Sequence, residues 1–363
     1  MSDFIEKIAI VAITKHGAKL ADRLKSLLGR GDIFVSSKFR DEVRGGVNFF
    51  ELSLRELIAD IWSCYDALVF FVSLGAVIRI IAPNIKDKHI DPAVITIDDN
   101  ANFVISVLSG HVGGANALTE DIAGLLESTP VITTASDVRK TIPVDILGRE
   151  FGWILEGEEN ITKVSAAVVN GEKIGLFQDA GEKDWWKRKT PIPENIKIYN
   201  SLDSMIGEGC AAYLIITDRV LNESYSSILQ RAVLYRPKSL VIGIGCDRGV
   251  SADEVEELVV STLRENSLSL KSVKGIATID NRKKEEGINR FAERYDLSVH
   301  YFTRDEINQV TDVPNPSEMA MKYVGVIGVA EPAAILGSNW GELIVPKVKS
   351  KMATLAVARI RFK

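Results

Sequence analysis

The stretch Phe103-Val-Ile-Ser-Val-Leu-Ser-Gly-His-Val-Gly-Gly-Ala-Asn116 contains the pattern that decides the fold. Its apolar run, 103–108, is typical of a buried strand, and an amphipathic helical pattern begins near Ala115. A glycine-rich turn between a strand and a helix gathers backbone N–H groups at one place, which suits anionic groups. His111 lies inside this turn, and histidine is the residue type whose unperturbed pKa lies nearest to neutral pH. The stretch therefore predicts a strand–turn–helix unit with a candidate site at its turn.

Short apolar runs alternate with helical patterns along the whole chain of 363 residues. This alternation is typical of α/β proteins whose mostly parallel sheets are flanked by helices. The length also exceeds what one hydrophobic core usually serves. We therefore expect a multi-domain α/β protein with an N-terminal α/β domain over 1–138, a small mixed α/β middle domain over 139–236 and a C-terminal α/β domain over 237–363.

Several local elements are predicted from their own patterns. Residues 98–102 predict a hairpin turn between two apolar runs. Ser53, Ser251 and Thr303 each precede a glutamate by three residues, which is the pattern of a capping box at a helix start. The middle region has weaker patterns, and its expected strands are 164–169, 173–177, 196–199 and 211–217.

Composition excludes several classes of function. The formal net charge is −5 and no basic cluster occurs, which argues against nucleic-acid binding. No apolar run reaches transmembrane length, and the first residues lack the pattern of a signal peptide. Cys64, Cys210 and Cys246 are far apart and odd in number, so they predict neither a disulfide framework nor a zinc site. We expect a cytoplasmic protein without a metal site of its own.

Five polar residues of the N-terminal region are candidates for a site. His111 fits a general acid or base, and equally a hydrogen-bonded loop histidine. Asn116 lies at the expected helix start, where it either contacts a ligand or bonds locally. Asp98 and Asp137 follow apolar runs, where α/β proteins place their sites, although Asp98 also suits a turn. Arg79 is the lone charge of an apolar segment, so we expect it to bind an anion or to form a buried ion pair.

The C-terminal region adds weaker candidates. Gly243-Ile-Gly-Cys-Asp-Arg-Gly249 follows a strand and precedes a helix, but its spacing departs from the dinucleotide fingerprint and the Walker lysine is absent. A nucleotide site is therefore disfavoured, while an anion site at Arg248 stays open. Asp280 and Lys283 follow a strand and belong to a site or to a solvated loop. Glu331 precedes a proline at an expected helix start, where it binds a ligand or caps the helix.

Taken together, these segments resemble one family, the cobalamin biosynthesis protein CbiG, cobalt-precorrin-5A hydrolase. The combination of Ser-Gly-His-Val-Gly-Gly-Ala-Asn with Gly-Ile-Gly-Cys-Asp-Arg-Gly is specific, whereas either segment alone is only suggestive. The middle region offers no matching motif. The segments that carry the resemblance are 74–79, 91–94, 108–116, 133–137, 243–249, 277–283, 329–334 and Lys347.

The resemblance implies a step of anaerobic vitamin B12 synthesis. The implied substrate is a cobalt-containing, ring-contracted tetrapyrrole with a δ-lactone, which water opens with release of acetaldehyde. Cobalt is part of that substrate, so no cofactor is expected. As a mechanistic hypothesis, His111 activates water or shuttles the proton for lactone opening, and the N–H groups of Gly113 and Gly114 form an oxyanion site. Asp98 and Asp137 are the other catalytic candidates. The implied substrate-binding residues are Arg79, Gly110, Gly113, Gly114, Asn116, Gly245, Arg248, Asp280, Lys283, Glu331 and Lys347.

Alternatives to this hypothesis stay open at the level of sequence. The competing function is a non-catalytic tetrapyrrole carrier that hands an intermediate to the next enzyme. A third interpretation, a nucleotide-dependent α/β enzyme, is disfavoured by the broken glycine fingerprint. The expected partner is the cobalt-precorrin substrate, without nucleic acid or membrane. A homodimer and transient contacts with neighbouring methyltransferases of the corrin pathway remain open.

Overall fold

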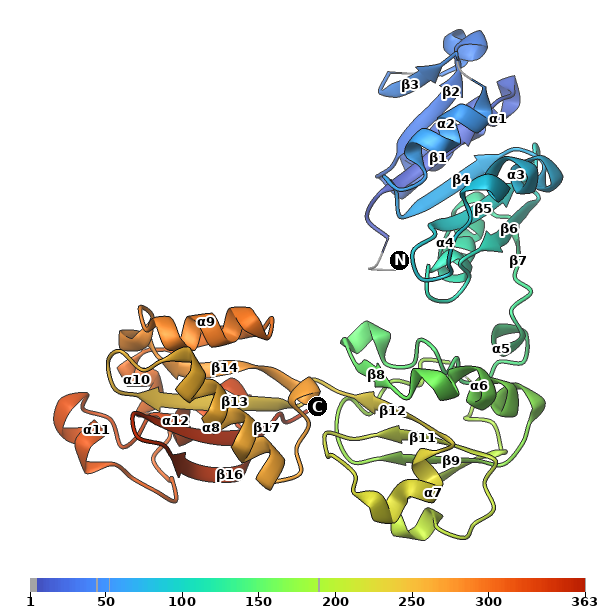
Figure 1. The fold of residues 1–363 in the computed structure, drawn as a ribbon. Coiled ribbons are helices and arrows are strands. Elements are labelled where there is room, and N and C mark those ends of the chain that lie inside the picture. The colour runs from blue at the N-terminus through green and yellow to red at the C-terminus, as the bar shows by residue number, and fades with distance from the viewer. Residues whose placement is uncertain (1–4, 44, 52, 189, 363) are drawn as a thin grey trace. The chain divides into compact units, whose positions relative to one another are not determined.

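A computed structural model describes residues 5–43, 45–51, 53–188 and 190–362. The chain divides after Ile146 into two compact units, and each is described by itself. The first unit contains one sheet and the second contains two, and all three sheets are mostly parallel and flanked by helices (Figure 1). This arrangement confirms the predicted α/β class. Within the described ranges, no helix is both long and apolar enough to cross a membrane.

The first unit is built on a seven-stranded sheet in the order β3-β2-β1-β4-β5-β6-β7. Strands β1 and β4 are buried along their whole length, because helices cover both faces of a parallel sheet. The strands are β1 Ile8–Ala12, β2 Asp32–Ser36, β3 Val47–Phe50, β4 Ala67–Phe71, β5 Ala93–Ile97, β6 Phe103–Leu108 and β7 Thr129–Val131.

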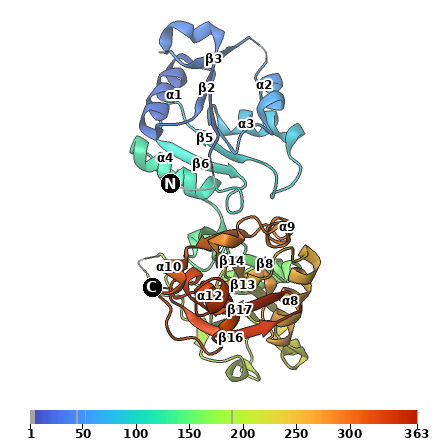
Figure 2. The same ribbon diagram turned by 90° about the vertical axis from the view of Figure 1, so that its left-hand side faces the viewer.

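Helices cover this sheet on its two faces (Figure 2). The apolar sides of α1 and α4 pack in one core, and those of α2 and α3 pack in a second core on the other face. The helices are α1 Lys15–Leu28, α2 Leu54–Ile61, α3 Leu74–Ile81, α4 Ala115–Leu126 and α5 Ala135–Val138, with 3-10 turns η1 Ser37–Glu42 and η2 Ala82–Asn84.

The reversal of direction at β6 decides where the candidate residues lie. Strand β6 pairs antiparallel with β5, which confirms the predicted hairpin, while β7 runs parallel to β6. Leu108, the last residue of β6, pairs with Val94 at the start of β5. The turns that follow β6 and β7 therefore meet at one edge of the sheet, and the 98–102 turn lies at the opposite edge.

The second unit begins with a five-stranded sheet in the order β10-β9-β11-β12-β8, in which only β8 is antiparallel to its neighbour. The expected strand over 164–169 is wrong, because these residues lie in helix α6, which Gly171 ends with a left-handed φ of 76°. The other three expected strands are confirmed, whereas β8 and β12 were not expected. The elements are β8 Ile154–Glu156, β9 Ile174–Gln178, β10 Ile196–Tyr199, β11 Ala212–Ile216, β12 Ala232–Arg236, α6 Ile161–Asn170 and α7 Ser226–Leu229, with 3-10 turns η3 Arg149–Phe151, η4 Glu158–Asn160, η5 Asp203–Met205 and η6 Glu223–Tyr225.

The third sheet has the order β15-β14-β13-β17-β16, with β17 antiparallel to both of its neighbours. Helices α8 and α9 pack in one core of this sheet, and α12 packs in two smaller clusters. The elements are β13 Leu240–Cys246, β14 Val273–Ile279, β15 Ser298–Phe302, β16 Glu342–Lys349, β17 Ala353–Arg359, α8 Ala252–Glu265, α9 Glu286–Arg294, α10 Arg304–Ile307, α11 Glu318–Tyr323 and α12 Ala330–Gly337, with 3-10 turns η7 Leu270–Ser272 and η8 Asp280–Arg282.

The predicted helix caps are present at all three positions. Ser53 and Thr303 form complete capping boxes at the starts of α2 and α10. Ser251 caps α8 by accepting a hydrogen bond from the Glu254 N–H. The Glu254 carboxylate does not complete the box, because it accepts hydrogen bonds from Ser350 Oγ and the Met352 N–H.

Candidate functional site

The turn between β6 and α4 closes on itself through its own backbone. Gly114 has a φ of +83° and precedes α4, and its N–H donates to the His111 carbonyl at 3.0 Å. The N–H groups of Ala115 and Asn116 donate to the carbonyls of Ser109 and Gly110. These bonds hold the backbone of the turn, and so fix the point from which the His111 side chain extends.

Two glycines of this turn are required by close contacts. A Cβ at Gly113 would lie 2.3 Å from the Ser109 Cβ, and one at Gly110 would lie 2.8 Å from the Asn116 Oδ1. Both distances are shorter than real contacts of a Cβ. Gly110 is a predicted residue of the site, and it also has a packing role, because its lack of a Cβ leaves space for the Asn116 side chain.

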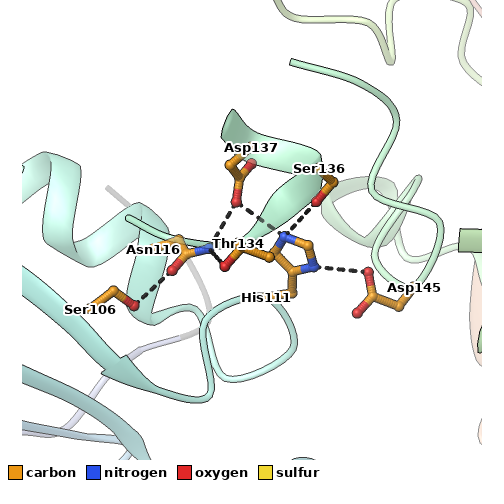
Figure 3. A network of polar contacts seen from close by, with 7 residues as sticks. All are labelled: Ser106, His111, Asn116, Thr134, Ser136, Asp137 and Asp145. Carbon is orange, nitrogen blue, oxygen red and sulfur yellow. Dashed lines mark hydrogen bonds and ion pairs between the residues drawn. The ribbon is translucent and has the colours of Figure 1, made fainter. Parts of the chain in front are cut away.

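His111 lies between two carboxylates (Figure 3). Its Nδ1 is 3.1 Å from Asp145 Oδ1, and its Nε2 is 3.1 Å from Asp137 Oδ2. Ser136 Oγ also lies 3.0 Å from Nε2. The imidazole side chain is 14% exposed, against 27% for Asp137 and 21% for Asp145, so all three side chains are partly accessible to a ligand.

The two carboxylates determine the protonation state of the histidine. Burial by itself lowers the pKa of His111, but the hydrogen bonds and charges of Asp137 and Asp145 outweigh burial and raise the pKa to about 9. Burial raises the pKa of Asp145, yet the hydrogen bond and charge of His111 bring that pKa below its ordinary value. Near neutral pH the ring is therefore an imidazolium that donates to both carboxylates.

Asn116 connects the glycine turn to the segment that follows β7. Its Nδ2 donates to Thr134 Oγ1 at 2.9 Å and to Asp137 Oδ2 at 2.8 Å, and its Oδ1 accepts from Ser106 Oγ at 2.7 Å. The side chain is buried, so these bonds are shielded from water. Asn116 thereby orients Asp137 toward His111.

Asp98 does not join this group. It lies at the opposite end of β6, because it begins the hairpin turn whereas His111 follows the end of the strand. Its carboxylate accepts hydrogen bonds from the N–H groups of Phe103 and Asn100 and from Asn102 Nδ2. The structure gives Asp98 the alternative role, that of a turn residue.

The predicted oxyanion site is reduced to one donor. The Gly114 N–H is already bonded within the turn. The Gly113 N–H donates no hydrogen bond within the described part of the chain. Only the latter is available to a developing oxyanion, so the imidazolium of His111 becomes the main positive group of the site.

Arg79 lies on the exposed side of α3 and not in a buried ion pair. Its Nη1 donates to the Gly75 carbonyl at 3.0 Å, and it forms no ion pair with any residue that the structure describes. The apolar segment around it is amphipathic, with Val77 and Ile81 buried. The charge therefore faces solvent, where it is available to an anion.

The glycine motif of the third sheet has a packing role. Gly243 and Gly245 lie within β13 and not in the turn after it. A Cβ at Gly243 would lie 1.9 Å from the Ala330 carbonyl oxygen, so the bare backbone admits α12 against the strand. A Cβ at Gly245 would meet Thr354 Oγ1 at 2.8 Å. A phosphate cradle requires glycines in the turn, where only Gly249 has a positive φ.

The other C-terminal candidates fall into two groups. Arg248, Asp280 and Lys283 are exposed in the turns after β13 and β14. Glu331 is buried, and its carboxylate accepts hydrogen bonds from the backbone N–H and the side-chain amide of Asn315 and from the Lys347 N–H.

The backbone N–H of Lys347 donates to the Glu331 carboxylate, while the Lys347 ammonium donates to the Asn315 carbonyl. Burial lowers the pKa of Lys347. The structure thus brings Glu331 and Lys347 together in an anchor for the loop that contains Asn315.

We call His111 and the residues that contact its ring, Ser136, Asp137 and Asp145, the histidine site. Ser136 and Asp145 were not among the predicted residues. Ser136 lies in the 133–137 segment, so its place beside Asp137 was the available signal. Asp145 gave no signal, because it follows a region without any strand or helix pattern. No group of three or more histidine, cysteine, aspartate or glutamate side chains suited to a metal ion occurs among the described residues.

Three family descriptions match successive parts of the chain. They are Cobalamin synthesis G N-terminal over residues 56–137, Cobalamin biosynthesis central region over 142–237 and Cobalamin synthesis G C-terminus over 240–358. The middle region, which offered no motif, is therefore also matched.

Curated relatives agree with these descriptions. A protein of Priestia megaterium named cobalt-precorrin-5A hydrolase is 46% identical, over 98% of this chain and 95% of the relative. One of the same name in Salmonella typhimurium is 30% identical over 97% of each chain. Protein CobE of a Sinorhizobium species is 32% identical over 33% of this chain and 79% of its own length. The chain belongs to the family of cobalamin synthesis G proteins.

Proposed function

We propose that this protein is a cobalt-precorrin-5A hydrolase, which opens the δ-lactone of a ring-contracted cobalt tetrapyrrole and releases acetaldehyde. The observation that carries the proposal is the imidazolium of His111 held between Asp137 and Asp145. The full-length similarity to two proteins named for that hydrolase supports the choice of substrate. A cytoplasmic location is part of the proposal, since the three cysteines are free.

The geometry assigns separate roles to the acid and the base of lactone opening. Asp137 is the more exposed carboxylate and accepts a proton from the attacking water, whose oxygen bonds to the lactone carbonyl carbon. The lactone C–O bond then breaks, and His111 Nε2 donates its proton to the leaving oxygen. The Gly113 N–H and the imidazolium charge stabilise the negative oxygen of the intermediate.

Release of acetaldehyde uses the same histidine in the reverse direction. His111, now neutral, removes the proton from the freed hydroxyl group. The C–O bond becomes a carbonyl, the adjacent C–C bond to the macrocycle breaks, and its electron pair stays in the macrocycle. Acetaldehyde leaves, the new carboxylic acid on the acetate side chain releases its proton to solvent to become a carboxylate, and Asp137 also returns its proton to solvent. Asp145 is a positioning residue in this scheme, since it fixes the ring through Nδ1.

The test is an anaerobic assay of acetaldehyde with purified cobalt-precorrin-5A. We expect His111→Ala and Asp137→Asn to lower turnover at least about a hundredfold, as loss of a general acid or base does. His16→Ala and Asp98→Asn are matched controls, because His16 is exposed on α1 and Asp98 lies at the other end of β6, and both should keep near-normal turnover.

Two outcomes would overturn the proposal. Full activity of His111→Ala would move the chemistry to another site. Binding of the substrate by the wild-type protein without any acetaldehyde would support the alternative function, a tetrapyrrole carrier.

A further inference from the structure

Large apolar side chains lie exposed on α3 and on the loop after it. Ile78 is 49% exposed, Ile85 is 43% exposed and Ile90 is 71% exposed. Single exposed apolar residues are ordinary on a protein surface, but a cluster marks a contact site. Ile78 lies on α3, Ile85 directly follows η2, and Ile90 lies in the loop before β5.

The loop over 85–91 is held in a closed turn. Both carboxylate oxygens of Asp91 accept the Lys86 N–H, at 3.1 and 2.9 Å. The N–H groups of Ile90 and Asp91 donate to the Asp87 carbonyl. These bonds bring residue 91 back to residue 86 and close the loop. Ile90 is exposed in this closed loop, whereas the neighbouring Asp91 is buried.

Positive charge surrounds these isoleucines. Arg79, Lys86 and Lys88 are exposed, and Asp87 is the single exposed carboxylate between residues 74 and 90. Asp87 Oδ1 accepts the His89 N–H at 2.9 Å, which directs that carboxylate to its own turn. We call the six residues with apolar or positive side chains the α3 surface: Ile78, Arg79, Ile85, Lys86, Lys88 and Ile90.

The α3 surface adjoins the histidine site. Ser109 Oγ, two residues before His111, donates to the Asp91 carbonyl at 2.9 Å. Lys88 also acts on Asp145 through its charge. Burial raises the pKa of Asp145, whereas His111 and, to a smaller extent, Lys88 lower it. The closed loop and the glycine turn are thus direct neighbours at one edge of the first sheet.

We propose that the α3 surface binds the face of the tetrapyrrole whose lactone reaches His111. Ile78, Ile85 and Ile90 contact the apolar macrocycle, while Arg79, Lys86 and Lys88 bind its peripheral carboxylates. The inference rests on the proposed function. It deepens that function by placing the substrate on residues that the sequence alone did not select, apart from Arg79.

The test measures binding by the full chain with a stable probe. Cobyrinic acid is a cobalt corrinoid with free carboxylate side chains, and cobinamide is a corrinoid in which amides replace them. In calorimetric titrations at fixed salt, we expect Ile78→Ser/Ile90→Ser to raise the Kd of both corrinoids about tenfold. Lys86→Gln/Lys88→Gln should raise the Kd of cobyrinic acid about tenfold, reduce its salt dependence and leave cobinamide unchanged.

Matched controls come from the other side of the same sheet. Leu27 on α1 is 42% exposed, and Lys38 is exposed on η1, so Leu27→Ser and Lys38→Gln should bind both probes as the wild type does. If a double variant melts earlier than the wild type, the single variants Ile90→Ser and Lys88→Gln at exposed loop positions replace it.

The outcomes separate this inference from the proposed function. If both double variants have wild-type Kd values and still release acetaldehyde, the proposed binding role of the α3 surface is overturned and the proposed hydrolase activity is retained. The expected Kd changes without acetaldehyde release by the wild-type protein would support the surface and overturn the hydrolase.

Discussion

Asp145 Oδ1 lies 3.1 Å from His111 Nδ1, although the two residues are 34 positions apart in the chain. Asp137 contacts the other ring nitrogen at the same distance. A histidine with carboxylates on both nitrogens is stabilised as an imidazolium, so it begins a reaction as an acid. This relationship changes the simplest expectation for His111, in which a neutral ring activates water.

The titration of His111 tests this assignment directly. We expect the ring to titrate with a midpoint near pH 9 in the wild type. Asp145→Asn removes one carboxylate and should move the midpoint toward the ordinary value of 6.5. Histidine NMR spectra over pH 5–11 check this, with His111→Gln to assign the signal. A wild-type midpoint near 6.5 would contradict the two-carboxylate arrangement.

Stability should depend on pH with a defined sign. The pKa of His111 is raised on folding, so its contribution is complete below about pH 6.5 and is lost as pH rises through about 9. The loss is on the order of 3 kcal/mol if the full shift applies. Urea unfolding at several pH values measures it. His111→Gln should be less stable at pH 6 and should lack this decline, and an identical decline in the variant would contradict the linkage.

Ser136 distinguishes an acid role of His111 from a nucleophilic triad. Its Oγ lies 3.0 Å from His111 Nε2, in line with Asp145 on the other nitrogen, which is the contact pattern of a serine–histidine–aspartate triad. Ser136 is buried, however, and Asp137 competes for Nε2. We therefore expect Ser136→Ala to lower kcat by less than about tenfold. A loss above about a thousandfold, with an ester adduct in the wild type detected by mass spectrometry, would establish Ser136 as the nucleophile.

The glycine turn should not tolerate a methyl group at Gly113. A Cβ there would lie 2.3 Å from the Ser109 Cβ, so Gly113→Ala must deform the turn and should cost about 1–3 kcal/mol along with most of the activity. Gly124→Ala in α4 is the matched control. A Cβ at Gly124 meets nothing within 4 Å, and the change should stabilise the helix by about 0.5–1 kcal/mol. Thermal unfolding and acetaldehyde release measure both effects.

The role of Gly243 is tested by the same approach. Gly243→Ala places a Cβ 1.9 Å from the Ala330 carbonyl oxygen and should separate α12 from β13, with a loss of about 3 kcal/mol or more. Gly328→Ala is the control, since the nearest atom to its Cβ is Pro332 Cδ at 3.9 Å. Chemical unfolding measures the difference. Equal stability of the two variants would contradict the packing role and return the motif to ligand binding.

Local patterns in the sequence predicted much of the fold. The β5–β6 hairpin, the strand–turn–helix around His111 and the capping boxes at Ser53 and Thr303 depend on residues close in the chain, so their signals are readable locally. The valines within 164–169 favour a strand, but packing against the sheet and the closing Gly171 place these residues in the helix α6.

Residues close together in the chain are enough to predict the α/β class, the glycine turn with its histidine, and the candidacy of Asp137 and Asn116. Which carboxylates contact that histidine depends on how distant segments pair in the folded chain. The reversal at β6 sends Asp98 to the far edge of the sheet and brings the segment after β7 to the near edge, and Asp145 arrives from a segment without local pattern. The physical reason is that strand direction and register are fixed by pairing between distant segments, which no local spacing records.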